Sequence, residues 1–158
     1  MAKRYWLFKS DPDEFSIEDL EISKNKTACW DGVRNYQARN FMRDEIKKGD
    51  GILFYHSNTD PLAITGYCEV TRENYPDHTQ FDPKDKHFES KSKADSPTWV
   101  MVDIRLVKKF KNPIHLASIK KNPKLKDLKL IKKGNRLSVM PVMKEEWDEI
   151  FNFGNEKK

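Results

Sequence analysis

Five segments of the chain have the apolar patterns of β-strands, either alternation with polar residues or a short aromatic or apolar run. These segments are 5–9, 51–57, 62–70, 99–107 and 136–142. In the second segment, Ile52 and Phe54 fall on one face and Leu53 and Tyr55 on the other, so we expect this strand to be covered on both sides. The turn-forming sequence 58–61 joins the second and third segments and predicts an antiparallel hairpin. We expect the last two segments to be further antiparallel members of the sheet.

Helical patterns lie between these segments. We expect a helix at 17–24 with Ser16 as its cap and Asp19 in the capping-box position, and a helix at 36–48 with Asn35 as its cap. A third helix is expected at 144–153, where one apolar face packs on the core. Two weaker elements are a turn opened by Pro113 that runs through Lys121, and a stripe with three-residue spacing at Leu125, Leu128 and Ile131.

The stretch 71–97 has no sustained periodicity, and a loop of this length is usually functional or mobile. The chain has 158 residues, a length that suits one domain and would bury roughly 70% of its unfolded surface. Many short strands with hairpin spacing and a few short helices predict an α+β fold. We expect a small mixed β-barrel of about five to six strands that forms a single domain over 1–158.

The charge of the chain is concentrated in one segment. The net charge is +5, but 104–136 holds twelve basic residues and one acid, so it carries +11 and the remainder carries −6. Clustered cations attract phosphates, and we expect Lys129, Lys132 and Lys133 to hold the backbone of a nucleic acid. The alternative is that these lysines form a solvated face that keeps the domain in solution.

Several classes of chemistry lack their residues. Gly49 and Gly51 do not form part of a phosphate-binding loop, because the later glycine and lysine of such motifs are missing. The four histidines are scattered, and Cys29 and Cys68 are too few for a disulfide framework or a cysteine zinc site. No nucleophile elbow and no isolated carboxylate pair occurs. We therefore expect no metal, no cofactor and no enzymatic activity.

The location of the protein follows from its apolar segments. None of them approaches the roughly 18 residues of a membrane span, and the charge at Lys9 interrupts any signal-peptide core. We expect an unexported protein without membrane contact in a reducing compartment: intracellular and cytoplasmic, or nuclear in a eukaryote.

Four segments place polar hydrogen-bonding groups beside aromatic residues at the ends of predicted strands: 8–12, 29–40, 54–58 and 134–142. In this order they resemble the EVE domain of the PUA-like superfamily, a relative of the YTH and ASCH domains. The likeness covers nearly the whole chain. Its further motifs are Tyr-Trp-Leu-Phe-Lys-Ser at 5–10, Tyr-Pro-Asp at 75–77, Gln-Phe-Asp-Pro-Lys at 80–84 and Glu-Glu-Trp at 145–147. Asp11 replaces a common glutamate, and Met143 stands where a Ser or Thr cap is usual.

The resemblance implies a non-enzymatic pseudobarrel that recognises a modified base flipped into an aromatic pocket. The base is 5-substituted cytosine in DNA or a modified base in RNA. The resemblance makes Trp30 the stacking face, Ser10 and Asn35 the groups at the base edge, and Lys9 a residue of the entry. The other expected ligand-binding residues are Arg39, Ser57, Asn58, Trp99, Arg136 and Ser138, of which Arg136 would clamp a phosphate.

Purely structural roles are the alternatives for these residues, and two alternatives remain for the function. Trp30 could be a core residue, and Asn35 could be only a helix cap. The chain could be an accessory enzyme of RNA modification or processing, which would need a pocket carboxylate with a raised pKa. It could also be a protein-interaction barrel, whose mouth would be filled. A slot about one base wide beside Trp30 would favour base recognition by a monomer that binds DNA or RNA.

Overall fold

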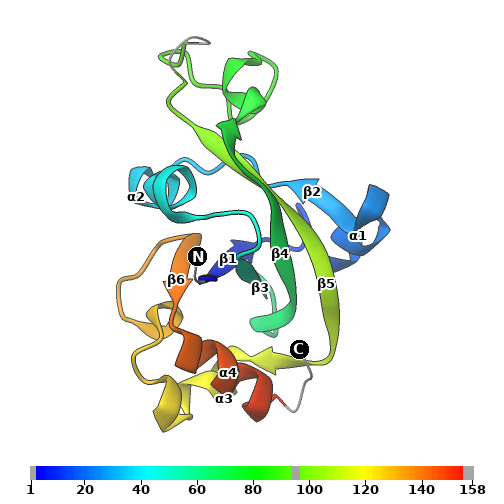
Figure 1. Cartoon of the computed structure of the whole chain (residues 1–158), viewed down its shortest axis with the longest axis vertical. Coiled ribbons are helices and arrows are strands. Elements are labelled where there is room, and N and C mark those ends of the chain that lie inside the picture. Colours follow the sequence, from blue (N-terminus) through cyan, green and yellow to red (C-terminus); the bar gives the residue numbers. More distant parts are fainter. Residues whose placement is uncertain (1–2, 94–96, 155–158) are drawn as a thin grey trace.

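The computed structural model describes residues 3–93 and 97–154 and is built on one mixed sheet of six strands (Figure 1). The strands are β1 (Tyr5–Ser10), β2 (Thr27–Cys29), β3 (Gly51–His56), β4 (Ala63–Pro76), β5 (Val100–His115) and β6 (Val139–Val142). Their order in the sheet is β2-β5-β4-β3-β1-β6. All neighbours are antiparallel except β1 and β3, which are parallel. The predicted hairpin is the β3–β4 pair.

Short helices cover this sheet, in agreement with the α+β class expected from the sequence. They are α1 (Ile17–Ile22), α2 (Tyr36–Asn40), α3 (Leu116–Lys120) and α4 (Lys144–Phe153). Single turns of 3-10 or π helix complete the set: η1 (Lys24–Lys26), η2 (Phe41–Glu45), η3 (His78–Phe81), η4 (Pro123–Leu125) and η5 (Lys129–Ile131). Helices α3 and α4 lie together at the lower end of the molecule in Figure 1, and α2 lies beside its upper half.

The sheet is covered on both faces, as the pattern in the second strand predicts. In β1, Trp6 and Phe8 enter one buried cluster, which α1 joins through Ile17 and Leu20. Leu7 enters a second cluster, to which α4 contributes Trp147, Ile150 and Phe151. Each face of a central strand therefore has its own core.

Local capping agrees with the sequence where the caps are short polar residues. The Ser16 hydroxyl accepts from the Asp19 N–H at 3.1 Å, and the Asp19 carboxylate accepts from the Ser16 N–H at 2.9 Å. Met143 lacks a capping hydroxyl, but its own N–H donates to the Glu146 carboxylate at 2.9 Å. Helix α4 therefore begins and ends at the predicted residues, Lys144 and Phe153.

Several boundaries differ from the expectation. The helix predicted for 36–48 leaves α-geometry at Asn40 and continues as the π turn η2 to Glu45. The element predicted from Pro113 through Lys121 begins later than expected, as α3 at Leu116, because β5 runs on to His115. Its pairing with β4 shifts register between Ile64 and Gly66, and such an irregular stretch tolerates a proline. The apolar stripe with three-residue spacing forms 3-10 turns, and β2 is too short to show a pattern.

Asp50 joins the start of β1 to the turn before β3. Its side chain accepts from the Trp6 indole Nε1 at 3.0 Å, the Arg4 N–H at 3.1 Å and the Lys47 N–H at 3.0 Å, and Asp50 is only 3% exposed. Three donors thus depend on one buried carboxylate.

We expect Asp50→Ala to lower the free energy of unfolding by about 3 kcal/mol or more, because each buried donor left unpaired costs about 1 to 3 kcal/mol. Urea unfolding followed by circular dichroism measures this loss. The matched control is Asp13→Ala, since Asp13 is exposed and should change stability little. Equal stability of the two variants would contradict the bridging role of Asp50.

Candidate functional site

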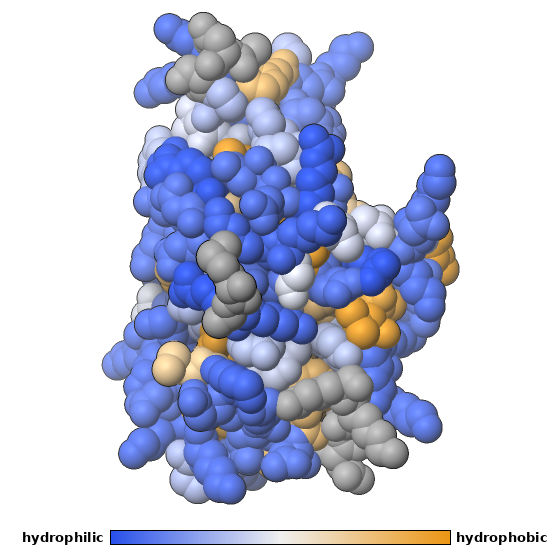
Figure 2. Space-filling view, viewed as in Figure 1, coloured by the Kyte–Doolittle hydropathy of each residue, from blue (hydrophilic) through white to orange (hydrophobic). Residues whose placement is uncertain are grey.

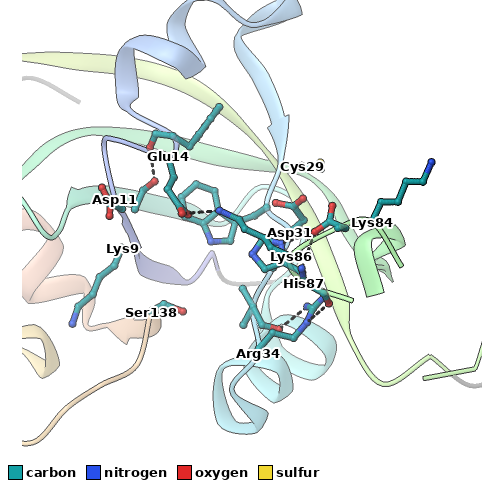
Figure 3. A pocket seen from close by; sticks show the side chains of 16 residues that line it. Lys9, Asp11, Glu14, Cys29, Asp31, Arg34, Lys84, Lys86, His87 and Ser138 are labelled. Atoms are coloured by element: carbon teal, nitrogen blue, oxygen red, sulfur yellow. Dashed lines mark hydrogen bonds and ion pairs between the residues drawn. The ribbon is translucent and has the colours of Figure 1, made fainter. Parts of the chain in front are cut away.

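A cavity of about 680 Å³ is lined by residues from both ends of the strand order, near β2 on one side and near β1 and β6 on the other. One side is formed by the end of β1, the segment after it, and Ser138 just before β6. The other side is formed by the segment that follows β2 and by residues 84–87. Figure 3 shows Lys9 and Ser138 on the first side and Arg34 and His87 on the second. The lining residues are Lys9, Ser10, Asp11, Glu14, Phe15, Cys29, Trp30, Asp31, Gly32, Val33, Arg34, Lys84, Asp85, Lys86, His87 and Ser138.

Trp30 belongs both to the core and to the cavity wall. Its N–H donates to the Val102 carbonyl at 2.7 Å, which continues the β2–β5 ladder by one residue. Its indole packs on Phe8 at a ring distance of 5.1 Å and meets Phe54 edge-on at 5.6 Å. Only 8% of the residue is exposed. Trp30 is therefore a core residue that also forms part of the cavity wall.

The end of β1 places three of the expected residues together. Ser10 lines the cavity, and its hydroxyl donates to the Phe15 carbonyl, which leaves the hydroxyl oxygen able to accept a further hydrogen bond. The Lys9 N–H donates to the Ser138 carbonyl at 2.8 Å and holds Ser138 against β1. Lys9 is half-buried, and burial lowers the pKa of its ammonium group. The first side of the cavity thus offers two hydroxyls and one partly desolvated cation.

The second side is organised by Asp77, which follows β4 and is fully buried. Its carboxylate accepts from the Gly32 N–H at 2.7 Å and from Arg34 Nη1 at 3.0 Å. The N–H and hydroxyl of Thr79 donate to it at 2.8 and 2.5 Å. Burial opposes the ionisation of Asp77, but these hydrogen bonds outweigh it, so its pKa lies below the ordinary value.

Arg34 ties residues 84–87 to this centre. Its Nε and Nη2 donate to the His87 carbonyl at 3.1 and 2.7 Å. Gly32 has a φ of 77°, and an added Cβ would lie only 2.4 Å from the His87 ring, so glycine is required there on both counts. Lys86 reaches across the cavity to Glu14, with which it forms an ion pair at 2.6 Å (Figure 3).

Asp31 is a cavity residue that the sequence analysis did not select. Burial raises the pKa of its carboxyl group, and the negative charge of nearby Asp77 raises it further. Its position directly after Trp30, in the motif at 29–40, could have identified it from the sequence. Arg34 lies in the same motif, whereas His87 was set aside as an isolated histidine because its spatial neighbours are distant in sequence.

The structure places only part of the expected set in the cavity. Lys9, Ser10, Trp30 and Ser138 line it. Asn35 instead caps α2, and its side-chain oxygen accepts from the Ala38 N–H at 2.9 Å.

The remaining expected residues surround the cavity lining or lie farther out. Arg39 donates to the Thr98 carbonyl at 3.0 Å, and Trp99 is 3% exposed beneath Tyr36. Ser57 donates its N–H to the Ser10 carbonyl at 2.9 Å, and Asn58 reaches the Asp11 carboxylate at 3.5 Å.

The basic residues of the 104–136 segment that we selected are all exposed and outside the cavity lining. They are Lys129, Lys132, Lys133 and Arg136. Lys132 pairs with Asp127 at 3.3 Å. In Figure 1, the segment between α3 and β6, which includes η5, runs from the end of the molecule that holds α3 and α4 to the start of β6.

Residues 3–93 and 97–154 hold neither of two other kinds of site. No helix there is both long and apolar enough to cross a membrane. Over the same residues, no three His, Cys, Asp or Glu side chains gather in a way that could hold a metal ion.

Comparison with known proteins gives one consistent result. The EVE domain model matches residues 4–153. Thymocyte nuclear protein 1 from Danio rerio is 45% identical over 96% of this chain and 72% of its own length. The human protein of that name is 41% identical over 94% of this chain and 72% of its own length.

Solved structures agree in fold as well as in sequence. The crystal structure of human THYN1 in complex with DNA containing 5-methylcytosine is 39% identical, with a TM-score of 0.91, and the match covers 99% of this chain and all of that one. A Pseudomonas putida protein is 44% identical, with a TM-score of 0.89 over 95% and 99% of the two chains. These matches bear out the resemblance and the PUA-like fold that it implies. The chain belongs to the EVE domain family.

Proposed function

We propose that this protein binds nucleic acid that carries a modified base and holds that base, flipped out of its stack, in the cavity beside Trp30. The observation that carries the proposal is the cavity itself, because an open space of about 680 Å³ with an indole in its wall can take up a single base. A protein-interaction barrel would have a filled mouth. The DNA-bound human relative supports 5-substituted cytosine in DNA as the ligand, with a modified RNA base as the alternative.

The charges of the cavity suit a neutral base better than a phosphate. Its lining has as many cations as anions, four of each: Lys9, Arg34, Lys84 and Lys86 against Asp11, Glu14, Asp31 and Asp85. Two of these cations are already committed, Arg34 to Asp77 and Lys86 to Glu14. The phosphates of the strand would therefore be held outside, by basic residues such as Arg136 and Lys129.

The polar groups of the cavity can distinguish one base from another. A carboxylate accepts from the exocyclic amine of cytosine, and Asp31 is the lining carboxylate next to the indole. The hydroxyls of Ser10 and Ser138 would meet other atoms of the base edge. We infer that Trp30 provides stacking that tolerates any base, and that these three residues provide selectivity.

The raised pKa of Asp31 favours a second candidate, an enzyme in which this carboxyl group moves a proton during RNA modification or processing. We favour the binding module because the neighbours of Asp31 are engaged in structural contacts of the cavity wall. Asp77 accepts from Gly32 and Arg34, and the His87 carbonyl accepts from Arg34. Mass spectrometry of a modified oligonucleotide after incubation with the protein separates the two candidates. An unchanged mass supports binding alone, and a new mass would establish catalysis.

The intracellular or nuclear location remains a prediction; the vertebrate relatives carry the name of a nuclear protein.

Replacing Trp30 by Ala should weaken binding of an oligonucleotide with 5-methylcytosine by about tenfold or more, because the loss of one base–aromatic stack costs about 1 to 3 kcal/mol. Fluorescence anisotropy measures the affinity. Since Trp30 also packs on Phe8 and Phe54, the variant will be less stable, so the control is Trp147→Ala, a buried indole in the other cluster. Equal loss of affinity in both variants would remove Trp30 from the binding site.

Replacing Asp31 by Asn should lower affinity for the methylated strand by roughly 5- to 150-fold near neutral pH, because a carboxylate–amine contact is worth about 1 to 3 kcal/mol. The folded protein raises the pKa of Asp31, so ionisation of this group opposes folding. That penalty is absent below the ordinary aspartate pKa and complete above the folded pKa. Asp31→Asn should therefore keep or increase thermal stability at neutral pH while it weakens binding.

The affinity of the wild type should also fall as pH drops through the raised pKa of Asp31, and Asp31→Asn should not follow that fall. Anisotropy titrations over a pH series measure both. Parallel pH profiles would show that Asp31 does not contact the base.

A further inference from the structure

A second group of aromatic and cationic side chains lies beside the cavity, on α2 and just before β5. The ring of Tyr36 stacks on the ring of Trp99 with 5.0 Å between centroids and 29° between planes. The Arg39 guanidinium lies 5.0 Å from the Tyr36 centroid and 5.9 Å from that of Trp99. Tyr36 is 62% exposed, whereas Trp99 is buried, so the tyrosine presents its ring to solvent on a firm support.

This stack is continuous with the cavity wall. Arg34 lines the cavity, and its guanidinium also lies 5.3 Å from the Trp99 centroid. The order from the cavity to the exposed surface is therefore Arg34, Trp99 and Tyr36. A chain that leaves the cavity on this side would meet the tyrosine ring next.

The support of the stack is rigid. The Trp99 N–H donates to Gln80 Oε1 at 3.0 Å, and the Trp99 carbonyl accepts from Gln80 Nε2 at 2.7 Å and from the Asp77 N–H at 3.0 Å. The Asn35 cap fixes the first turn of α2, which begins with Tyr36. A ring held in this way loses little conformational freedom when a ligand stacks on it.

The surroundings of Tyr36 point to a nucleic acid as the occupant. The face around α2 is dominated by hydrophilic residues (Figure 2), unlike the apolar patch of a protein interface. Arg39 flanks the stack, and its side chain donates only to neutral oxygens, the Thr98 carbonyl and the Asn40 amide, so its charge matches a phosphate backbone. The other exposed aromatic rings, Phe88 and Phe153, show no comparable stack in the part of the chain described.

We propose that Tyr36 is a stacking platform for a second nucleobase, the neighbour of the base in the cavity, and that Arg39 contacts the phosphate of that neighbour. Removal of one base from its stack leaves a face of the next base uncovered, and the exposed tyrosine ring covers it. This proposal rests on the proposed function, because it assigns the platform and the cavity to one strand.

The test uses single-stranded oligonucleotides with one 5-methylcytosine and 2-aminopurine as its neighbour on the 5′ or the 3′ side. With the wild type and Tyr36→Phe, binding should change the 2-aminopurine fluorescence at one of the two positions. With Tyr36→Ala this change should disappear and affinity should fall roughly 5- to 150-fold, the value of one base–aromatic stack. The ratio of methylated to unmethylated affinity should stay as in the wild type, because the cavity is unchanged.

Phe153→Ala is the matched control, since it removes a partly exposed ring far from the cavity, on α4, and should leave fluorescence and affinity unchanged. Thermal unfolding verifies that Tyr36→Ala is folded, as expected for an exposed side chain. If Tyr36→Ala binds and changes the fluorescence like the wild type, the ring only covers Trp99 and the platform is wrong. If the wild type shows no preference for the methylated strand, the proposed function fails and the platform fails with it.

Discussion

The carboxylate of Asp77 is fully buried and accepts hydrogen bonds from four donors, which belong to Gly32, Arg34 and Thr79. A charge in such a place is costly unless its donors are all present, and their joint contribution keeps this one ionised. The donors come from segments more than 40 residues apart. The backbone after Trp30 and the segment 84–87, which Arg34 holds, therefore share one centre. Orientation of the indole and closure of the second side of the cavity depend on the same interaction.

The open edges of the sheet explain where the cavity can form. Strands β2 and β6 are at the two ends of the strand order and do not pair with each other in the described structure. A barrel closed by hydrogen bonds would bring these edges together and leave no room between them. Here the segments that extend β2 and precede β6 stand apart and provide the two walls. The sheet thus supplies a rigid frame, and its unclosed seam supplies the space for a ligand.

Two ionisable groups of the cavity lining, Asp31 and Lys9, are partly buried in a way that opposes their charged forms and so lowers the stability of the folded protein. Asp31 faces the field of Asp77, and burial and that field together raise its pKa. On the other side, burial lowers the pKa of Lys9. Partly desolvated polar groups cost free energy when no ligand pairs with them, and they discriminate strongly between ligands that do and do not match them. Such a trade of stability for selectivity is what a base-reading site requires.

The sequence by itself determined the strands with clear alternation, the hairpin, the caps at Ser16 and Asn35, and the extent of α4, because these depend on neighbours along the chain. Together with the motif order it also placed Lys9, Ser10, Trp30 and Ser138 at one site. It did not reveal the long course of β5, because register shifts break the alternation and allow Pro113 within a strand. Only the tertiary structure decided that Asn35 lies outside the cavity lining, and that Asp31 and His87 belong to that lining. The segments that carry Asp31 and His87 are joined through Asp77 and Arg34, and no local pattern connects them.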